Sequence, residues 1–293
     1  MKKTILYLSA IGFMFTACQK EDATGPETPS GSKSGIIANV SPVPASFVKK
    51  VLVEEFTSQT NGDVPATDRY FDILALNNSG RVYTAALYNG GALSHPETSR
   101  LLSTLTPGTA SIPCGSIDRT PINGSVFQAP AQLQPLVNGM LNKPTNAGLA
   151  MVSSVNGRRA NVDVHVGFSA TLTSSYSVHA YLIEDVVTTG TIYSQANNFN
   201  STPGNQFYQM GNPIINYLHR NVMRKMITPA NGHSINPANL VTGGTEIFSL
   251  QVDLMEKSTS NSQFKVLCFI TDDLSGEVLN VQMGTLGTLK DWN

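Results

Sequence analysis

The spacing of apolar residues changes near residue 147, and no other feature of the sequence constrains the fold as strongly. Before this point, runs of strand type alternate with segments whose apolar residues recur at helical spacing. After it, several strand-type segments follow one another with only turn residues between them. Alternating strands and helices favour a parallel sheet, whereas successive strands favour two antiparallel sheets packed face to face. The sequence therefore predicts an α/β domain over 46–146 and an antiparallel β-sandwich over 147–293.

In the first half we expect a buried strand over 48–56, a polar loop, and a helix that begins at Pro65. A second strand is expected over 81–88, and Ser94 with Glu97 forms a capping box that predicts the next helix. A strand-helix-strand order implies a crossover that joins a parallel pair of strands. A last helix is predicted from apolar residues at helical spacing, namely Leu133, Leu136, Val137, Met140 and Leu141.

In the second half, Asn156-Gly157 is a strong signal for a two-residue hairpin turn between strands. After it, Val162, Val164 and Val166 alternate with mostly polar residues, which is typical of a half-buried strand. The later strand-type runs are separated by Gly, Asn, Ser and Asp. This succession of strands is the basis for the predicted sandwich.

The N-terminus carries the signals of a secreted lipoprotein. Lys2 and Lys3 precede an apolar run over 5–17, which is shorter than the roughly 20 residues that a membrane-spanning helix needs. The residues Phe-Thr-Ala before Cys18 resemble a lipobox. We therefore expect residues 1–17 to be a cleaved signal peptide and Cys18 to carry acyl chains such as palmitate, which hold the protein at a lipid bilayer. The alternative is an ordinary signal peptide with a chance cysteine.

Residues 18–45 are expected to form a flexible linker, because Pro, Gly, Ser and Thr dominate it and large apolar residues are few. Its first residues, Gln19 to Asp22, resemble the short charged tag that directs some Gram-negative lipoproteins to the outer face of the outer membrane. The alternative is simply the solvated start of a linker. With the tag, the expected location is the outer membrane, facing the cell exterior.

Composition limits the partners. Charged residues make up 13% of the chain, against about 25% in typical globular proteins, which suits an extracytoplasmic β-rich protein. The formal net charge of -1 and the lack of a basic face argue against nucleic acid as a partner. Apart from Cys18 the cysteines are Cys114 and Cys268, which fall in different expected domains. We therefore expect no disulfide between them.

The segment that begins at Glu55-Phe56-Thr57 resembles the start of the thioredoxin-like domain in the twenty-eight-kilodalton outer-membrane protein family of surface lipoproteins. In that family a Glu-Phe-Thr-Gly stretch is followed by Cys-x-x-Cys-Pro. With Pro65 aligned to the family's proline, the two cysteine positions fall on Asn61 and Val64. Dithiol exchange needs an attacking thiolate and a second thiol to resolve the mixed disulfide. The resemblance therefore implies a degenerate thioredoxin-like domain without oxidoreductase activity.

The resemblance continues at Ile112-Pro113, where the family has Ile-Pro beside its dithiol site. It implies a cis peptide bond before Pro113 and places Cys114 next to the vacated site. A lone cysteine there either captures a small thiol or is an inert, semi-buried side chain. Carboxylates also gather nearby, and side chains of this kind in loops are usually solvated; they are Glu54, Glu55, Asp63 and Asp68.

In the second half the resemblance consists of a Glu-Asp pair followed along the chain by a Gln, a His and an Arg, in the order found in the family. It falls on Glu184, Asp185, Gln195, His219 and Arg224, while Arg220 stands where the family has Asn. Because adjacent strand residues point to opposite faces, at most one of the two acids points inward, where it can pair with Arg224 or His219. This polar cluster either binds a ligand or fixes the long connection between two strands.

Other chemistry has no support in the sequence. The histidines lack metal-ligand spacing, and neither a nucleophile elbow nor a phosphate-binding glycine loop is present, so no metal or cofactor is expected. A surface cation near Asp272 is left open, although the repeated acidic ligands of calcium loops are missing. The leading interpretation is a non-catalytic module that binds an unknown protein or small molecule. The alternatives are a thiol-related role of Cys114 and a scaffold for an outer-membrane complex.

Overall fold

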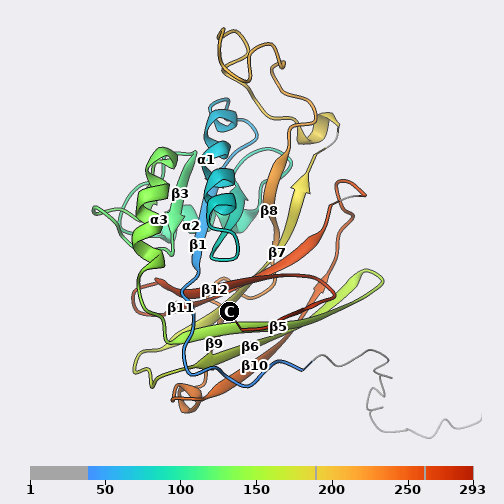
Figure 1. Cartoon of the computed structure of the whole chain (residues 1–293). Helices are drawn as coiled ribbons and strands as arrows, with labels where there is room; N and C mark the ends of the chain where they lie inside the picture. The colour runs from blue at the N-terminus through green and yellow to red at the C-terminus, as the bar shows by residue number, and fades with distance from the viewer. Residues whose placement is uncertain (1–38, 189, 261, 293) are drawn as a thin grey trace, which may run out of the picture. The chain divides into compact units, whose positions relative to one another are not determined.

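The structure, a computed structural model, describes residues 39–292 apart from residues 189 and 261. This part of the chain is mostly β, with a mixed sheet of nine strands, a second sheet of four strands and a few helices (Figure 1). The first elements are β1 (Val51–Thr57), α1 (Val64–Asn77), β2 (Val82–Tyr88), α2 (Pro96–Thr104), β3 (Cys114–Ile117), β4 (Phe127–Gln128) and α3 (Leu133–Leu141). The strands that follow are β5 (Ala147–Asn156), β6 (Arg159–Phe168), β7 (Tyr176–Val187), β8 (His219–Met226), β9 (His233–Ser234), β10 (Thr245–Asp253), β11 (Phe264–Asp272), β12 (Val278–Thr285) and β13 (Leu289–Lys290). Short 3-10 turns lie at Pro130–Gln132, Thr191–Tyr193 and Pro237–Asn239.

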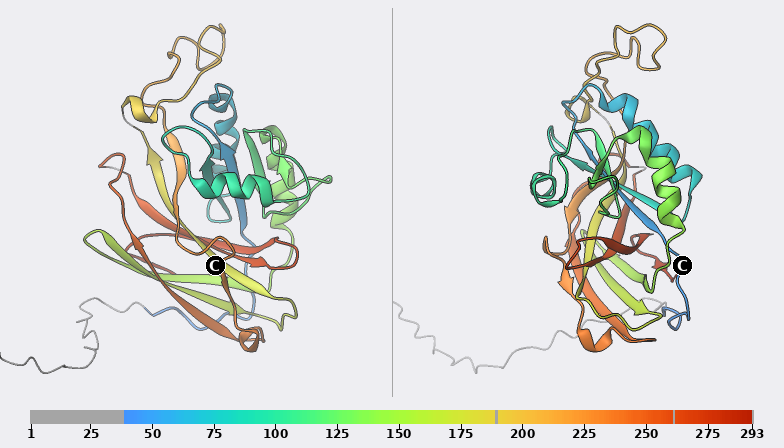
Figure 2. Two further views of the ribbon diagram at one scale, coloured as in Figure 1. Left: turned by 180° about the vertical axis from the view of Figure 1, so that it is seen from behind. Right: turned by 90° about the vertical axis from the view of Figure 1, so that its left-hand side faces the viewer.

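The first half builds an α/β layer around β1. This strand pairs in parallel with β2, as the strand-helix-strand order predicts, and antiparallel with β3. Helices α1 and α3 bury Phe71 and Val137 against one face of these strands, where Val51 and Val53 point. Helix α2 buries Leu101 on the opposite face, so helices cover both sides of the layer (Figure 2).

The start of α2 differs from the prediction. Its N-cap is His95, whose Nδ1 accepts a hydrogen bond from the Glu97 amide at 3.3 Å. Pro96 occupies the first turn, where its fixed φ suits the helix and its missing amide is not needed. The residue directly before Pro96 therefore caps the helix, and the capping box predicted from Ser94 is wrong.

The second half forms the expected two-layer sandwich, but only one of its sheets is confined to that half. The four-stranded sheet has the order β10-β6-β5-β13 and is antiparallel throughout. Its inner face, which includes Val164 and Phe168, packs against Val178 of β7 and Cys268 of β11. The core of the sandwich therefore lies between this sheet and the β7-β11 part of the nine-stranded sheet.

The second sheet of the sandwich is mixed rather than antiparallel, which corrects the sequence expectation. Strand β8 pairs antiparallel with β7 and in parallel with β2, where Val222 lies opposite Ala86. The sheet therefore crosses the boundary expected between 46–146 and 147–293. The cause is local packing, because Val222 is fully buried beside Ala86 and Tyr88. Strand β8 lacks a clear apolar alternation and is not predicted from the sequence.

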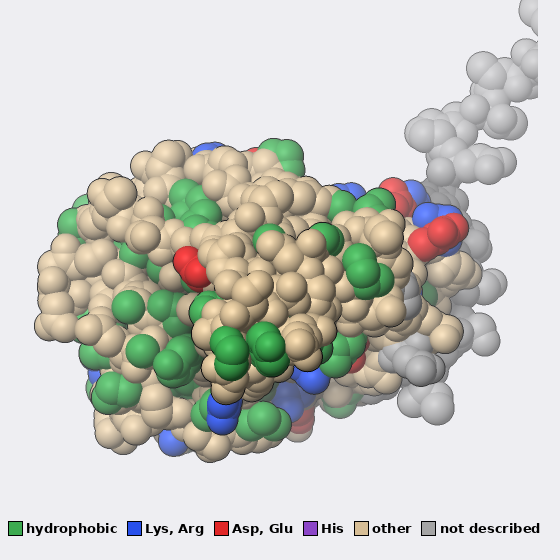
Figure 3. Space-filling model, turned by 90° about the horizontal axis from the view of Figure 1, so that it is seen from above, with side chains coloured by type: hydrophobic (Ala, Val, Ile, Leu, Met, Phe, Trp, Pro, Cys, Tyr) green, Lys and Arg blue, Asp and Glu red, His purple; other side chains and the backbone are tan. Residues whose placement is uncertain are grey.

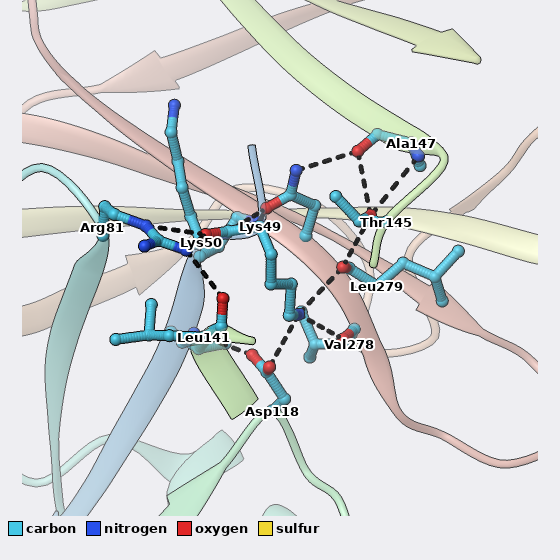
Figure 4. A network of polar contacts seen from close by, with 12 residues as sticks. Lys49, Lys50, Arg81, Asp118, Leu141, Thr145, Ala147, Val278 and Leu279 are labelled. Atoms are coloured by element: carbon cyan, nitrogen blue, oxygen red, sulfur yellow. Dashed lines mark hydrogen bonds and ion pairs between the residues drawn. The ribbon is translucent and has the colours of Figure 1, made fainter. Parts of the chain in front are cut away.

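A buried lysine joins the two halves of the chain (Figure 4). The Nζ atom of Lys49, just before β1, forms an ion pair with Asp118 at 2.7 Å. It also donates to the carbonyl oxygens of Val278 and Leu279 in β12, at 3.2 and 2.9 Å. Thr145 donates to the same Leu279 oxygen at 3.1 Å. One ammonium group therefore connects β1, the segment after β3, and β12.

A second buried ion pair joins Arg119 to Glu54 of β1. Arg119 donates to both carboxylate oxygens of Glu54 at 2.8 and 2.7 Å, and to Tyr181 Oη at 2.8 Å. Its guanidinium also lies 4.9 Å from the centre of the Phe269 ring. Bidentate geometry of this kind gives strong, directional contacts. The pair links β1 to β7 and β11, again across the boundary between the two halves.

The described start of the chain is packed rather than flexible. Trp292 Nε1 donates to the Ser41 carbonyl oxygen at 2.7 Å, and the Asp291 carboxylate accepts from the Ser41 amide and hydroxyl. Val40 and Val43 pack against the Phe47–Trp292 cluster. The described residues of the segment expected as a linker, 18–45, therefore contact the last residues of the described chain.

The expected signal peptide 1–17, the acylated Cys18 and the linker up to residue 38 lie outside the described residues. Within the part that is described, no helix combines the length and apolar character that crossing a membrane would require.

Candidate functional site

The positions that match the family's dithiol hold a structural contact. Asn61 Nδ2 donates to the Ile112 carbonyl oxygen at 2.9 Å, while Asn61 Oδ1 accepts from the Asp63 amide. Val64 is fully buried at the first position of α1. The predicted cis bond between Ile112 and Pro113 is confirmed. The fold therefore brings these positions together, with an amide and an aliphatic side chain in place of thiols.

Cys114 is buried beside these residues, with 4% of its surface exposed. It lies on β3 opposite Phe56. Burial raises the pKa of its thiol to about 11. Because the thiolate is the reactive form, such a thiol reacts slowly at neutral pH. Cys268 is also buried and free, with its Sγ 3.6 Å from the sulfur of Met151, so the two cysteines do not form a disulfide.

The polar cluster expected in the second half divides into separate contacts. Glu184 is fully buried and pairs with Arg224, and it also accepts from the Ser258 amide at 2.6 Å. Asp185 points to the other face and accepts from the Gln263 amide at 2.7 Å. Glu184 therefore lies between the strand pair β7-β8 and the segment before β11.

His219 does not join this ion pair. Its Nδ1 is 2.7 Å from the Tyr88 hydroxyl, and its Nε2 is 2.7 Å from the Tyr193 carbonyl oxygen. Burial lowers the pKa of His219 to about 4, so the ring is neutral at pH 7. Residues 188–218 form the long connection between β7 and β8, called here the 188–218 connection. Within it, Gln195 donates to the carbonyl oxygens of Ser58 and Asn61 at 3.2 and 2.8 Å, which holds the connection against the loop after β1.

The contacts of Arg224 favour a structural role, and this yields a testable prediction. Arg224→Met should lower the free energy of unfolding by about 2–3 kcal/mol, because Glu184 is left buried without its cation. Denaturant or thermal unfolding measures the loss. Arg220→Met on the same strand is the matched control and should change little, since its pair with Asp72 is exposed. Unchanged unfolding of Arg224→Met together with lost ligand binding would favour a ligand-binding role instead.

The carboxylates near the vacated site are not a solvated loop cluster, which corrects the expectation. Glu54 and Glu55 are both buried in β1 and point to opposite faces, Glu54 toward Arg119 and Glu55 toward α1. Asp63 is exposed and accepts from Asn198 Nδ2 at 2.8 Å. Asp68, from α1, shares a hydrogen bond with Glu55. The sequence places two acids side by side in β1, but their separation to opposite faces follows only from the strand assignment.

Glu55 and Asp68 form a carboxyl pair that holds a proton. Glu55 Oε1 and Asp68 Oδ1 are buried, and apart from the contact between the two acids neither oxygen receives a hydrogen bond from a group of the described residues. Burial and the neighbouring Asp68 raise the pKa of Glu55 well above its usual range. Burial also raises the pKa of Asp68 to about 6, against the opposing effect of hydrogen bonds from Glu55 and Tyr217. Of the two acids, Glu55 therefore has the stronger tendency to hold a proton, which it shares with Asp68 through their hydrogen bond.

This pair lies at the wall of a cavity of about 440 Å³. The cavity is bounded by β1, β2, α1 and the end of the 188–218 connection. Tyr217 reaches across it and donates to Asp68 Oδ2 at 2.9 Å. The remaining lining is mixed. Its apolar and aromatic residues include Phe71, Tyr88, Phe207, Met210, Ile214 and Leu218, and its charged and polar residues are Arg69, Asp72, Thr84, Gln206, Asn216 and Arg220. A cavity of this size that combines apolar walls with convergent polar groups suits a small-molecule site.

The proton held by Glu55 predicts how stability depends on pH. A carboxyl whose pKa is raised by folding stabilises the protein below its unfolded pKa and loses that contribution as pH rises through the folded pKa. Glu55→Gln keeps the shape and cannot ionise. Its melting temperature should match the wild type near pH 4 and exceed it by roughly 2–6 °C at pH 7.5. Asp273→Asn, an exposed site, is the control and should show no such trend. A difference between Glu55→Gln and wild type that does not grow with pH would contradict the shared proton.

Asp272 and the other acids show no assembled metal site. Asp272 Oδ1 accepts from the amides of Leu274 and Ser275 at 2.8 and 3.0 Å, which closes the turn after β11. Across the described residues, no group of three or more His, Cys, Asp and Glu side chains is placed to hold a metal ion.

The fold defines a β-rich protein in which a mixed sheet covered by helices continues into a two-sheet sandwich. The chain belongs to the Omp28 family of outer membrane proteins, since the sequence model described as "Outer membrane protein Omp28" matches residues 106–290, more than half of the chain. The resemblance to the twenty-eight-kilodalton family is thereby confirmed, and the matched residues begin after Asn61 and Val64. The protein is therefore an outer membrane protein.

Among solved structures, the chain is similar to HBP35 of Porphyromonas gingivalis, with a TM-score of 0.61 and 17% sequence identity over 82% of this chain and 76% of that chain. At this identity the similarity is one of fold. A protein from Agrobacterium tumefaciens aligns with a TM-score of 0.47 and 12% identity over 82% of this chain and 96% of that one. No curated protein sequence matches the chain.

Proposed function

We propose that this outer membrane protein is a lipid-anchored module, facing the cell exterior, that binds a small ligand in the Glu55-Asp68 cavity without catalysing a reaction. The observation that carries the proposal is the cavity of about 440 Å³, lined by both apolar and polar side chains, at whose wall Glu55 and Asp68 form a buried carboxyl pair without a cation from the described residues. Buried polar groups normally have partners, and apart from their mutual contact Glu55 Oε1 and Asp68 Oδ1 have none, so these oxygens are available to a ligand.

The first half of the protein acts, in this proposal, as a degenerate thioredoxin-like domain. The parallel β1-β2 pair, the antiparallel β3 and helices on both faces support this interpretation. The vacated dithiol positions at Asn61 and Val64 lie close to the cavity wall, because Val64 precedes the cavity-lining Pro65. Binding replaces thiol exchange at this end of the sheet.

The thiol-related alternative has weaker support. Cys114 is buried, and its raised pKa leaves little thiolate at neutral pH. An insulin-reduction assay tests it directly, and we expect no turnover above a Cys114→Ser control. Turnover by the wild type that Cys114→Ser loses would replace the binding proposal with a redox function.

A scaffold in an outer-membrane complex is the second candidate, favoured by one specific observation. Seen from above, the end of the molecule that carries the 188–218 connection shows hydrophobic side chains among uncharged polar groups (Figure 3). Exposed apolar residues there are Ile192, Met210, Ile215 and Leu218. Crosslinking in intact outer membranes from position 192 tests this role; a single protein adduct would support it.

Native mass spectrometry tests the binding function. The full chain, extracted mildly from its own membrane, should carry a small molecule. Leu218→Trp should remove it, because Leu218 lines the cavity and is 50% exposed, so a larger side chain enters the cavity at little cost to the core. Leu274→Trp, 91% exposed and remote, is the matched control and should retain the molecule. A bound mass that survives Leu218→Trp would contradict the proposed site.

The lipid anchor makes its own prediction. Cys18→Ser should move the protein from the membrane fraction to the soluble fraction and abolish labelling by a palmitate analogue, since two or more acyl chains supply the membrane affinity. Cys114→Ser, a cysteine within the fold, should leave both unchanged. Continued membrane association of Cys18→Ser without label would mean that something other than lipid anchors the protein.

A further inference from the structure

Glu55 differs from every other buried carboxylate in the described part of the chain. Glu54 pairs with Arg119, Asp118 with Lys49 and Glu184 with Arg224. Glu55 is 6% exposed, yet no Arg, Lys or His lies within ion-pair distance of it, and its nearest partner is another acid, Asp68. Among the described residues, Glu54, Asp118 and Glu184 each have a cation, whereas Glu55 and its partner Asp68, which line a cavity, have none.

The cations near the cavity do not reach Glu55. Arg220 is engaged by Asp72 at 3.3 Å, where both side chains are about half exposed. Arg69 is exposed on α1. His219 is neutral and bound to Tyr88 and Tyr193. Among the described residues, no side chain therefore supplies a positive charge to the carboxyl pair.

We propose that the cavity takes a protonated amine on an apolar body, and that its ammonium group replaces the proton shared by Glu55 and Asp68. This inference rests on the proposed binding function and specifies the chemistry of the ligand. Glu55 Oε1 and Asp68 Oδ1 are hydrogen-bonded by no third group of the described residues, so once the shared proton has left they offer two adjacent acceptors to the several N–H donors of an ammonium group. The displaced proton leaves to solvent.

The walls fit the rest of such a ligand. Phe207, Met210 and Ile214 from the 188–218 connection and Phe71 from α1 all line the cavity, so they supply apolar surface that removes the body of the ligand from water. Tyr88 and Tyr217 line the acidic end, where aromatic rings favour a nearby cation. The volume of about 440 Å³ accommodates a ring or a short chain, since small-molecule pockets span roughly 300–1,000 Å³.

Binding should depend on pH because a proton is exchanged for the ligand. The titratable and charged groups around Glu55 are Asp68, Arg69 and Asp72 from α1, Tyr88 from β2, Cys114 from β3, and Tyr217, His219 and Arg220 at and after the end of the connection. Of these, Asp68 titrates near pH 6. At pH 5.5 both acids are largely protonated and the pair is uncharged. At pH 7.5 the pair carries one negative charge, and it releases its one remaining proton when an ammonium group binds. Amine affinity should therefore increase about 10-fold or more between these values.

The test uses three probes with one phenyl ring each: 2-phenylethylamine, phenylacetate and 2-phenylethanol. Calorimetry on the full mature chain in lipid nanodiscs, with empty nanodiscs as the blank, measures each affinity at pH 5.5 and 7.5. We expect 2-phenylethylamine to bind with a dissociation constant on the order of 1 mM or below at pH 7.5. It should bind at least 10-fold more tightly than the alcohol, and phenylacetate should be the weakest.

Two variants separate the carboxyl pair from the cavity. Glu55→Gln removes the displaceable proton, so it should lose the amine preference and its pH dependence while still binding the alcohol. Leu218→Trp should lose all three probes, and Leu274→Trp should keep all three. Because Glu55→Gln is expected to be at least as stable as the wild type at pH 7.5, loss of the amine preference would not reflect unfolding.

The failure of this inference is distinguishable from that of the proposed function. Equal or tighter binding of phenylacetate would indicate that Arg69 and Arg220 select the ligand, and it would overturn the amine assignment while leaving the cavity as the binding site. Amine binding that is unchanged by pH or by Glu55→Gln would overturn it as well. No detectable binding of any probe would overturn the assignment too, and the native mass measurement on Leu218→Trp would then decide the proposed function separately.

Discussion

Arg119→Met should lower the free energy of unfolding by about 3–5 kcal/mol, one of the two largest losses that the structure predicts. Glu54 is fully buried and receives two hydrogen bonds from this guanidinium, so the substitution leaves a carboxylate buried without a cation. Tyr181 and the Phe269 ring lose contacts with Arg119 at the same time. Denaturant unfolding at pH 7.5 measures the change.

A double substitution identifies the cause of this loss. Glu54→Met combined with Arg119→Met removes both charges and should recover most of the stability, because two apolar side chains of similar volume replace a desolvated pair. Arg158→Met removes an exposed partner of Glu256 and should cost about 1 kcal/mol or less. A double variant as unstable as Arg119→Met alone would mean that lost packing, rather than the unpaired carboxylate, dominates.

Lys49→Met should be destabilising to a similar extent, about 3–5 kcal/mol at pH 7.5. Its ammonium group neutralises the buried Asp118 and holds two carbonyl groups of β12. Burial raises the pKa of Asp118 even with Lys49 beside it. Without Lys49, a proton is the remaining way to neutralise Asp118, so the loss should be smaller at pH 5 than at pH 7.5. Unfolding of the variant should remain a single cooperative transition with a lower midpoint, since the lysine connects both halves of the chain.

Lys50→Met is the matched control, one residue away. Lys50 is buried as well, but it forms no ion pair among the described residues, and burial with the nearby Lys290 lowers its pKa to about 8. Removing this poorly solvated charge should leave stability unchanged or raise it at pH 7.5. Equal destabilisation by Lys49→Met and Lys50→Met would show that side-chain volume, not the Asp118 pair, accounts for the effect.

Local patterns in the sequence predict much of the secondary structure. The apolar runs at 48–56 and 81–88 become the parallel strands β1 and β2. The predicted hairpin joins β5 and β6, although its two-residue turn is Gly157-Arg158, one residue later than predicted, because Asn156 still pairs with Arg159. The alternating valines of β6 face the sandwich core. These features depend on residues near one another in the chain, which is why periodicity and turn chemistry reveal them.

The continuity of the sheet could not be predicted in this way. Strand β8 pairs with β2 across more than a hundred residues of intervening chain, and its sequence, HRNVMRKM, shows no clear alternation. Its place is fixed by Val222, which packs against Ala86, and by the ion pair of Arg224 with Glu184. Such long-range pairing depends on the tertiary arrangement, so local sequence patterns do not predict it.

The candidate site was predictable only in part. The family resemblance draws attention to Asn61, Val64 and Cys114, and the structure gathers them at one end of β1 and β3. The feature that distinguishes the site is Glu55 with Asp68, which the sequence offers only as acids near a loop. The strand alternation of Glu54 and Glu55 is a usable signal for it, because one of two adjacent acids in a buried strand must face the opposite helix layer.

A crystal structure of the protein purified from its own outer membrane without refolding tests the proposed binding site most directly. We expect a bound molecule between α1 and the 188–218 connection, with a nitrogen atom within hydrogen-bond distance of Glu55 and Asp68. A carboxylate or neutral group in that position would contradict the amine assignment. A bound molecule elsewhere, with water alone beside Glu55, would show that this cavity is not the binding site.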